Sequence, residues 1–238
     1  MIEKPKLHPL ETAVCVVVIL LLSVGTYSRN KLWNNEISLW TDCVKKSPNK
    51  ARPYVDLGVA YFNAGDYDKS LETTQKAIEI DPKFGQAYYN LSVTYQKMGD
   101  LSKAIAMAKK SLEVEPTLSM PYYFLGGLYF EKGQYDESEK AFQRFLKKYP
   151  YFPEVHNLLA IVYAAQKKFD QAVTELEWEV RINPYHTLAH VNLGQIYWYE
   201  FRNREKALNH FKNALELDPL LPHRGEIQRL VRQLEGLP

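Results

Sequence analysis

Two histidines four residues apart, His186 and His190, are the side chains whose type and spacing come nearest to a metal-binding pair. Histidines at this spacing share one face of a helix and can both bind zinc, but a zinc site needs a third protein ligand. No glutamate of the kind found in a zinc-protease helix accompanies them. We therefore predict no metal site and expect His190 to pack as an aromatic residue near the start of a helix.

The glycine pair Gly126 and Gly127 comes nearest to a phosphate-binding loop. Nucleotide loops follow a strand and open a helix, whereas this pair follows Leu125 inside a segment with helical character. We expect these glycines to permit close approach of two helices. Because no stronger pattern of a nucleophile or ligand set is present, we predict no catalytic residue, no cofactor and no small-molecule substrate, and hence no enzyme.

A sequence repeat predicts the helices on which any functional site would have to lie. Prolines recur every 34 residues, at Pro82, Pro116, Pro150 and Pro184. Aligning the chain on them produces a tyrosine column and two columns of small residues, which predict where paired helices cross. The columns are Tyr61, Tyr95, Tyr129, Tyr163 and Tyr197; Gly58, Ser92, Gly126, Ala160 and Gly194; and Ser70, Ala104, Ser138, Ala172 and Ala207.

These columns resemble the tetratricopeptide-repeat (TPR) family over residues 51–219. The resemblance implies an all-α solenoid of helix-turn-helix repeats, with Gly65, Gly99 and Gly133 in left-handed turns. The expected segments are 1–28 with a membrane span, 29–50 as a degenerate half repeat, 51–84, 85–118, 119–152, 153–186 and 187–221 as five TPR repeats, and 222–238 as a capping helix.

Two repeats depart from the pattern. The fourth has Lys167 at the turn-glycine position and Glu179 where Ala77, Ser111 and Ala214 stand in other repeats, so its second helix is expected to pack less tightly. The fifth carries one additional residue before Ala207, which predicts a longer turn around residues 201–204.

The first helices of such an array line a concave face, and that face is the expected binding groove. Helical spacing projects an aromatic and amide-rich set of side chains toward it, which is typical of a surface that binds a protein or an extended peptide. The predicted contact residues are Phe62, Tyr89, Asn90, Val93, Tyr123, Phe124, Phe130, Asn192, Gln195 and Trp198. The same spacing also projects Val55, Val59, Gln96, Asn157, Ile161 and Val191 toward this face.

The opposite, convex face is expected to be solvated, because its second helices carry mixed charges. Examples are Glu137, Glu139, Lys140 and Arg144. The formal net charge of the whole chain is only +2, so the chain lacks the clustered basic residues that phosphate contacts require. We expect no nucleic-acid partner.

The amino-terminal region is apolar without interruption from Ala13 to Leu22. Residues 10–27 would extend roughly 27 Å as a helix, against about 30 Å of bilayer hydrocarbon, which predicts a single membrane span with Glu11 at the headgroups. A cleaved secretory signal and a buried helix of a soluble protein are the alternatives. Basic residues on both sides leave the orientation open.

The run from Tyr27 to Trp33, followed by Glu36, Trp40 and Pro48, resembles the junction between the last span and the TPR tail of transmembrane-and-TPR mannosyltransferases. This resemblance implies that the repeats lie outside the cytoplasm, in a periplasm or lumen. The active site of that family lies in other membrane helices, which this sequence does not contain, so the resemblance concerns topology and not activity.

The last segment places Ile227, Leu230, Val231 and Leu234 on one helical face, as expected of a cap on the final repeat. The sequence thus predicts a membrane-anchored TPR scaffold that holds protein partners in its groove. Two alternatives stay open. The first alternative is the TPR tail, a fragment or an accessory subunit of a multi-pass membrane glycosyltransferase. The second alternative is a secreted soluble periplasmic TPR adaptor.

Overall fold

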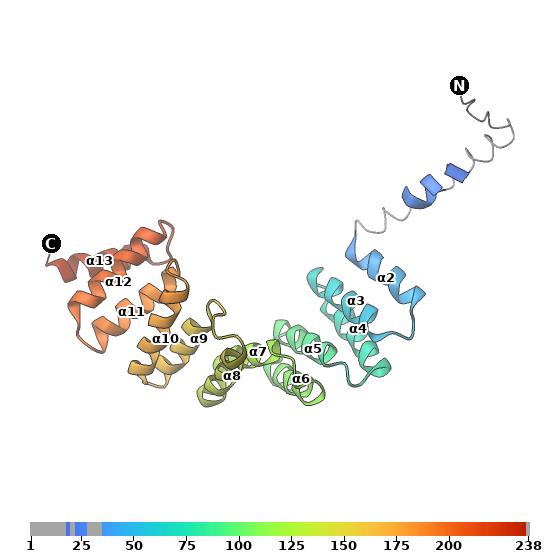
Figure 1. Ribbon diagram of the computed structural model, residues 1–238, viewed down its shortest axis with the longest axis horizontal. Coiled ribbons are helices and arrows are strands. Elements are labelled where there is room, and N and C mark those ends of the chain that lie inside the picture. Colours follow the sequence, from blue (N-terminus) through green and yellow to red (C-terminus); the bar gives the residue numbers. More distant parts are fainter. Residues whose placement is uncertain (1–17, 20–21, 28–34, 237–238) are drawn as a thin grey trace, which may run out of the picture. The chain divides into compact units, whose positions relative to one another are not determined.

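The computed structural model describes residues 18–19, 22–27 and 35–236, and α-helices are the only regular elements in these ranges (Figure 1). The helices are α2 Glu36–Lys46, α3 Ala51–Asn63, α4 Tyr67–Ile80, α5 Gly85–Lys97, α6 Leu101–Val114, α7 Met120–Glu131, α8 Tyr135–Lys148, α9 Val155–Ala165, α10 Phe169–Ile182, α11 Thr187–Tyr199, α12 Arg204–Leu217 and α13 Arg224–Glu235. The predicted all-α class is confirmed for this part of the chain.

Most of the predicted membrane span lies outside the described residues, which do not include 1–17 or 20–21. Within the ranges that the structure does describe, no helix combines the length and the apolar character needed to cross a bilayer. The structure therefore gives the predicted span of residues 10–27 no support. The start of the predicted half repeat, up to residue 34, is likewise outside the described part, whereas its helix is present as α2.

The chain divides into two compact units, Met1–Met98 and Gly99–Pro238. In the first unit, α2 packs on α3, α3 packs on α4, and α5 packs on both α3 and α4. In the second unit, each helix from α6 to α12 packs on the next helix along the chain. Each unit is therefore built mainly from helices that are neighbours in sequence, which is the packing expected of stacked hairpins.

Small residues lie where the two helices of a repeat cross, as predicted. A Cβ atom added to Gly126 would lie 2.6 Å from the ring of Phe142, and one added to Gly194 would lie 2.6 Å from the ring of Phe211. The second helix contributes a small buried residue at the same crossing, and Ser138 Oγ also donates a 2.7 Å hydrogen bond to the Gly126 carbonyl. These contacts confirm both small-residue columns as packing positions.

The tyrosine column forms part of the core in the second unit, where Tyr129, Tyr163 and Tyr197 are all buried. In the first unit Tyr61 and Tyr95 are half-buried. A cation lies over the ring of most of these tyrosines; for example, Lys206 Nζ is 4.7 Å from the centroid of Tyr197. The predicted inward orientation is thus confirmed, most fully in the last three repeats.

The turns inside the repeats follow the predicted chemistry. Gly65, Gly99 and Gly133 have φ values of 79°, 82° and 74°, in the left-handed region that favours glycine. Lys167 occupies the same position in the fourth repeat and adopts φ 60° despite its side chain. In the fifth repeat the longer turn is confirmed: α11 ends at Tyr199, α12 begins at Arg204, and Arg202 has φ 53°.

The second helices of the repeats end close to the recurring prolines. Each second helix from α4 to α12 ends two residues before its proline, because proline cannot continue the hydrogen-bond ladder. Helix α13 covers the last repeat through Ile227, Val231 and Leu234, which are buried against α12. Arg224, at the start of α13, adds a polar contact, because its guanidinium donates to the Leu215 and Asp218 carbonyls at the end of α12.

Candidate peptide-binding faces of the first helices

In the first unit, α3 and α5 bring four of the predicted contact residues together. Phe62 comes from the last turn of α3, whereas Tyr89, Asn90 and Val93 come from the middle of α5. All four line one pocket of about 230 Å³. Val59, one turn before Phe62, also lines it and is 38% exposed. These four side chains therefore lie around one concavity in this unit, and their contact with a partner stays a prediction.

The polar groups of this pocket are arranged in two layers. At its base, Ser70 Oγ and Thr94 Oγ1 lie 3.2 Å apart and are buried. Nearer the opening, Asn90 Oδ1 accepts a 2.9 Å hydrogen bond from Gln86 Nε2. That bond uses the carbonyl side of the Asn90 amide and holds the group in place, so its NH₂ can donate to an acceptor on a ligand.

In the second unit, α7 carries the predicted aromatic residues, and they are more deeply packed than expected. The ring centroid of Tyr123 lies 5.5 Å from that of Phe145 and 6.2 Å from that of Phe152. Burial, with a smaller contribution from the charge of Glu154, raises the pKa of the Tyr123 phenol. Phe130 packs at 5.5 Å on Tyr135. Tyr123 and Phe130 thus present only part of their surfaces to a ligand.

Helices α9 and α11 place an amide pair on the same face. Asn192 Nδ2 donates a 2.8 Å hydrogen bond to Asn157 Oδ1, and Asn157 is only 5% exposed. Gln195 is exposed and Trp198 is half-buried on the following turn of α11. Asn192 is therefore fixed by a neighbouring repeat, while Gln195 and Trp198 offer the surface that a partner can reach.

Three residues projected toward the groove are instead buried. Val55, Asn157 and Val191 are 3%, 5% and 9% exposed, so the predicted strip is narrower than helical spacing suggested. The reason is that a first helix contacts both its own second helix and a helix of the adjoining repeat, so side chains on two sides of it are covered. Phe124 remains half-buried on α7.

The sequence reasoning missed a set of buried histidine contacts. Glu179 was expected to loosen the fourth repeat, yet its side chain is fully buried, accepts a 2.9 Å hydrogen bond from the Glu154 amide, and lies 2.8 Å from His186 Nδ1. Buried His190 places its Nδ1 3.1 Å from His210 Nδ1. No signal in a single sequence pairs these residues, because they are brought together by the stacking of hairpins.

His156 joins this set through Glu175, whose Oε2 lies 2.6 Å from its Nδ1. Its other ring nitrogen lies 2.8 Å from the Pro150 carbonyl. Among the residues that the structure describes, no group of three His, Cys, Asp or Glu side chains is placed to hold a metal ion. The histidines therefore serve here as packed and hydrogen-bonded residues of the repeat interfaces.

Three family models match this stack of hairpins. A TPR-repeat model matches residues 58–99, one tetratricopeptide-repeat model matches residues 123–186, and a further tetratricopeptide-repeat model matches residues 85–118 and 188–219. The chain belongs to the TPR family. These matches begin within α3, so they do not extend to the amino-terminal junction, and its resemblance to the mannosyltransferase tail is not shown.

Several solved structures share the fold. YrrB, described as a TPR protein with an unusual peptide-binding site, is 23% identical with a TM-score of 0.68, over 83% of this chain and 98% of YrrB. MamA is 26% identical with a TM-score of 0.66, over 72% of this chain and 98% of MamA. PilF of Pseudomonas aeruginosa is 21% identical with a TM-score of 0.67, over 78% of this chain and 83% of PilF. No curated protein matches this TPR chain by sequence.

Proposed function

We propose that this TPR chain is a scaffold that binds an extended peptide segment of a protein partner on the first-helix faces of its repeats. The pocket between α3 and α5 carries the proposal, because it combines apolar walls with a fixed amide. An extended peptide presents alternating side chains and regularly spaced backbone carbonyls. In this proposal Phe62, Tyr89 and Val93 contact apolar side chains of the peptide, and the NH₂ of Asn90 donates a hydrogen bond to one of its backbone carbonyls.

The family supports the same class of function. TPR arrays act by protein–protein interaction, and YrrB, which shares the fold, has a peptide-binding site of its own. The proposal assigns no catalytic step to this chain. In the second unit, Gln195 and Trp198 on α11 are the residues best exposed for an equivalent contact.

The groove is tested with a peptide selected from a display library against the full-length chain. Phe62→Ala and Asn90→Ala should each weaken binding of that peptide by about tenfold, because each removes one of the groups that would contact it. Tyr185→Ala is the matched control, since its ring is 79% exposed beyond the end of α10. Equal affinities for all three variants, with circular dichroism showing intact helices, would exclude this pocket as the binding site.

We further propose that the chain is held at a membrane by a single span within residues 10–27, with its repeats outside the cytoplasm. The support is the uninterrupted apolar sequence from Ala13 to Leu22. Alkaline extraction of membranes from expressing cells tests it: a spanning chain stays with the lipid, whereas a cleaved adaptor appears in the supernatant as a shortened chain. Deletion of residues 1–28 should move the repeats to the soluble fraction.

The junction sequence favours one second candidate, an accessory subunit or tail of a multi-pass membrane glycosyltransferase. The observation behind it is the run from Tyr27 to Trp33 followed by Glu36 at the start of α2. Purification of the full chain in mild detergent discriminates between the two candidates. Co-purification of a multi-pass subunit in equal amount would support the glycosyltransferase candidate, whereas its absence would favour the scaffold.

A further inference from the structure

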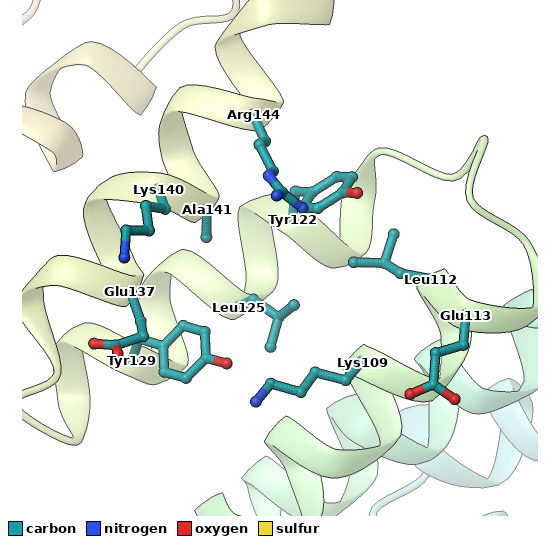
Figure 2. Close-up of a pocket in the computed structure, with 10 residues that line it drawn as sticks. All are labelled: Lys109, Leu112, Glu113, Tyr122, Leu125, Tyr129, Glu137, Lys140, Ala141 and Arg144. Atoms are coloured by element: carbon teal, nitrogen blue, oxygen red, sulfur yellow. The ribbon is translucent and has the colours of Figure 1, made fainter.

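A cleft of about 440 Å³ lies in the second unit between α6 and α8, with α7 as its floor (Figure 2). Its lining consists of Lys109, Leu112, Glu113, Tyr122, Leu125, Tyr129, Glu137, Lys140, Ala141 and Arg144. The charged residues among these were expected to form a plain solvated face. These charged residues are indeed exposed. They also surround an apolar floor, on the side of α7 that carries Tyr122 and Tyr129 and not Tyr123 and Phe130.

Ala141 distinguishes the lining of this cleft from that of the corresponding clefts in other repeats. The equivalent position holds Glu175 in the fourth repeat and His210 in the fifth, and these side chains meet His156 and His190 respectively. Tyr122 stands at the position of those histidines, but Ala141 is too small to reach it. The third repeat therefore lacks the side-chain pair that the next two repeats have at this position. Its cleft is lined there by Tyr122 and Ala141, whereas the cleft of about 400 Å³ in the fourth repeat is lined by His156 and Glu175.

The rim of the cleft has an excess of unpaired positive charge. Among the described residues, Lys109, Lys140 and Arg144 form no ion pair, whereas the acidic Glu113 is already paired with Lys110 at 2.9 Å. Glu137 is the one lining carboxylate without such a pair in this part of the chain. The rim can therefore accept carboxylates from a ligand without first breaking an ion pair of its own.

Two of these cations are held over aromatic rings. Lys109 Nζ lies 5.6 Å from the ring centroid of Tyr129, and Arg144 Cζ lies 5.7 Å from that of Tyr122. Figure 2 shows the Lys109 ammonium directed toward Tyr129 and the Arg144 side chain lying against Tyr122. The rings position the cations on opposite sides of the apolar side chains of Leu112 and Leu125.

We infer that this cleft is a second binding site, which takes an acidic segment of a partner protein with one large apolar side chain. The apolar side chain enters between Leu112, Leu125 and Tyr129, and the flanking carboxylates meet Lys109 and Arg144. The charge complementarity of the rim selects an acidic segment over a neutral or basic one. Because α7 presents different residues to this cleft and to the proposed groove, the two sites are separable by mutation.

The test uses the full-length chain in detergent and a fluorescein-labelled synthetic peptide, Gly-Asp-Glu-Phe-Asp-Glu-Gly, followed by fluorescence anisotropy. We expect the peptide to bind, and we expect Lys109→Glu with Arg144→Glu to weaken binding by at least about tenfold, since two attractive contacts become repulsive. Lys147→Glu is the matched control, because it makes the same charge change on α8 outside the cleft. It should alter the affinity by less than about twofold.

A second variant tests the cavity and not the charge. Ala141→Met introduces the residue that stands at this position in the second repeat, Met107, and should fill the cleft and weaken binding by a similar factor. A peptide with lysines in place of its acidic residues, or with alanine in place of phenylalanine, should bind at least about tenfold more weakly than the parent peptide.

Several results would overturn the inference. These are failure of the parent peptide to bind the wild-type chain, unchanged affinity in the double variant or in Ala141→Met, and equal binding of the lysine peptide. Weaker binding in Phe62→Ala would also overturn it, because the probe would then occupy the proposed groove. Loss of the groove function alone would leave this site intact, so the two proposals fail separately.

Discussion

The buried carboxylate of Glu179 accepts a 2.8 Å hydrogen bond from His186 Nδ1 across the turn that joins α10 to α11. Burial alone would raise the pKa of Glu179, but its hydrogen bonds with His186 and the Glu154 amide outweigh burial and hold that pKa below its usual value. The carboxylate thus connects the end of one repeat with the start of the next and with the start of α9.

We predict that Glu179→Gln lowers the free energy of unfolding of the second unit by about 1–3 kcal/mol, because charge-assisted hydrogen bonds become neutral ones. The contribution of the carboxylate is present above pH 4.5 and is lost as the pH falls through its lowered pKa. Urea denaturation at pH 7 measures the effect. Glu216→Gln, at an exposed position of α12, is the control, and equal stability of the two variants would contradict the prediction.

The contact between His190 and His210 predicts acid sensitivity. Burial, followed by the charge of His190, lowers the pKa of His210 to about 4, with Lys206 acting in the same direction and Glu177 opposing them. Burial also lowers the pKa of His190. A lowered histidine pKa means that the unfolded state binds more protons, so stability is complete above pH 6.5 and is lost as the pH falls toward 4.

Replacement of His210 tests this prediction. We expect the wild-type chain to lose about 1–2 kcal/mol more stability than His210→Phe between pH 7 and pH 5, because phenylalanine keeps the stacking on Tyr197 but cannot be protonated. Thermal unfolding monitored by circular dichroism across this range gives the comparison. Parallel pH profiles of the two chains would show that another group is responsible.

The adjacent glycines of α7 provide an internally matched pair. Gly126→Ala should destabilise the second unit by about 1–3 kcal/mol, because its Cβ would lie 2.6 Å from the Phe142 ring. Gly127→Ala meets nothing within 4 Å and should stabilise the helix by about 0.5–1 kcal/mol. Chemical denaturation of both variants checks the sign, and the same sign for both would mean that the crossing at Gly126 is wrongly placed.

Lys167 predicts a stabilising change. Its φ of 60° is costly for a residue with a side chain, and the three equivalent positions carry glycine. We expect Lys167→Gly to raise the free energy of unfolding by about 0.5–1 kcal/mol. Gly133→Lys, the reverse change in the preceding repeat, should lower it by a similar amount. A melting temperature that falls in Lys167→Gly would contradict this interpretation.

Much of the fold was predictable because the same pattern of small residues and tyrosines recurs in each repeat of the sequence. Gly126 and Tyr129 recur in phase with their counterparts, so helix crossings, turns and buried tyrosines could be placed without coordinates. Glu179 could not be interpreted in this way, because its partners are His186 in the next turn and Glu154 just before α9. Its fourth-repeat helix was predicted to pack loosely, whereas the side chain is fully buried.

The candidate sites were predictable only in part. Phe62 and Asn90 do line a common pocket, since helical spacing fixes which side of a first helix they occupy. Asn157 is buried and Tyr123 lies among other aromatic rings, because neighbouring repeats cover more of each helix than a single-helix projection allows. The cleft beside Ala141 was not predicted, because residues of α6, α7 and α8 line it together and a single-helix projection does not show how three helices meet.

The additional residue of the fifth repeat leaves the hairpin closed. The backbone N–H of Asn203 still donates a 2.8 Å hydrogen bond to the Tyr197 carbonyl, as the backbone N–H of Asp66 does to the Tyr61 carbonyl in the first repeat. The turn around Arg202 absorbs the insertion before α12 begins. Residues can therefore be added to this turn during evolution without shifting how the stacked helices pack. The same turn is a suitable place to graft an epitope or to attach a fluorophore.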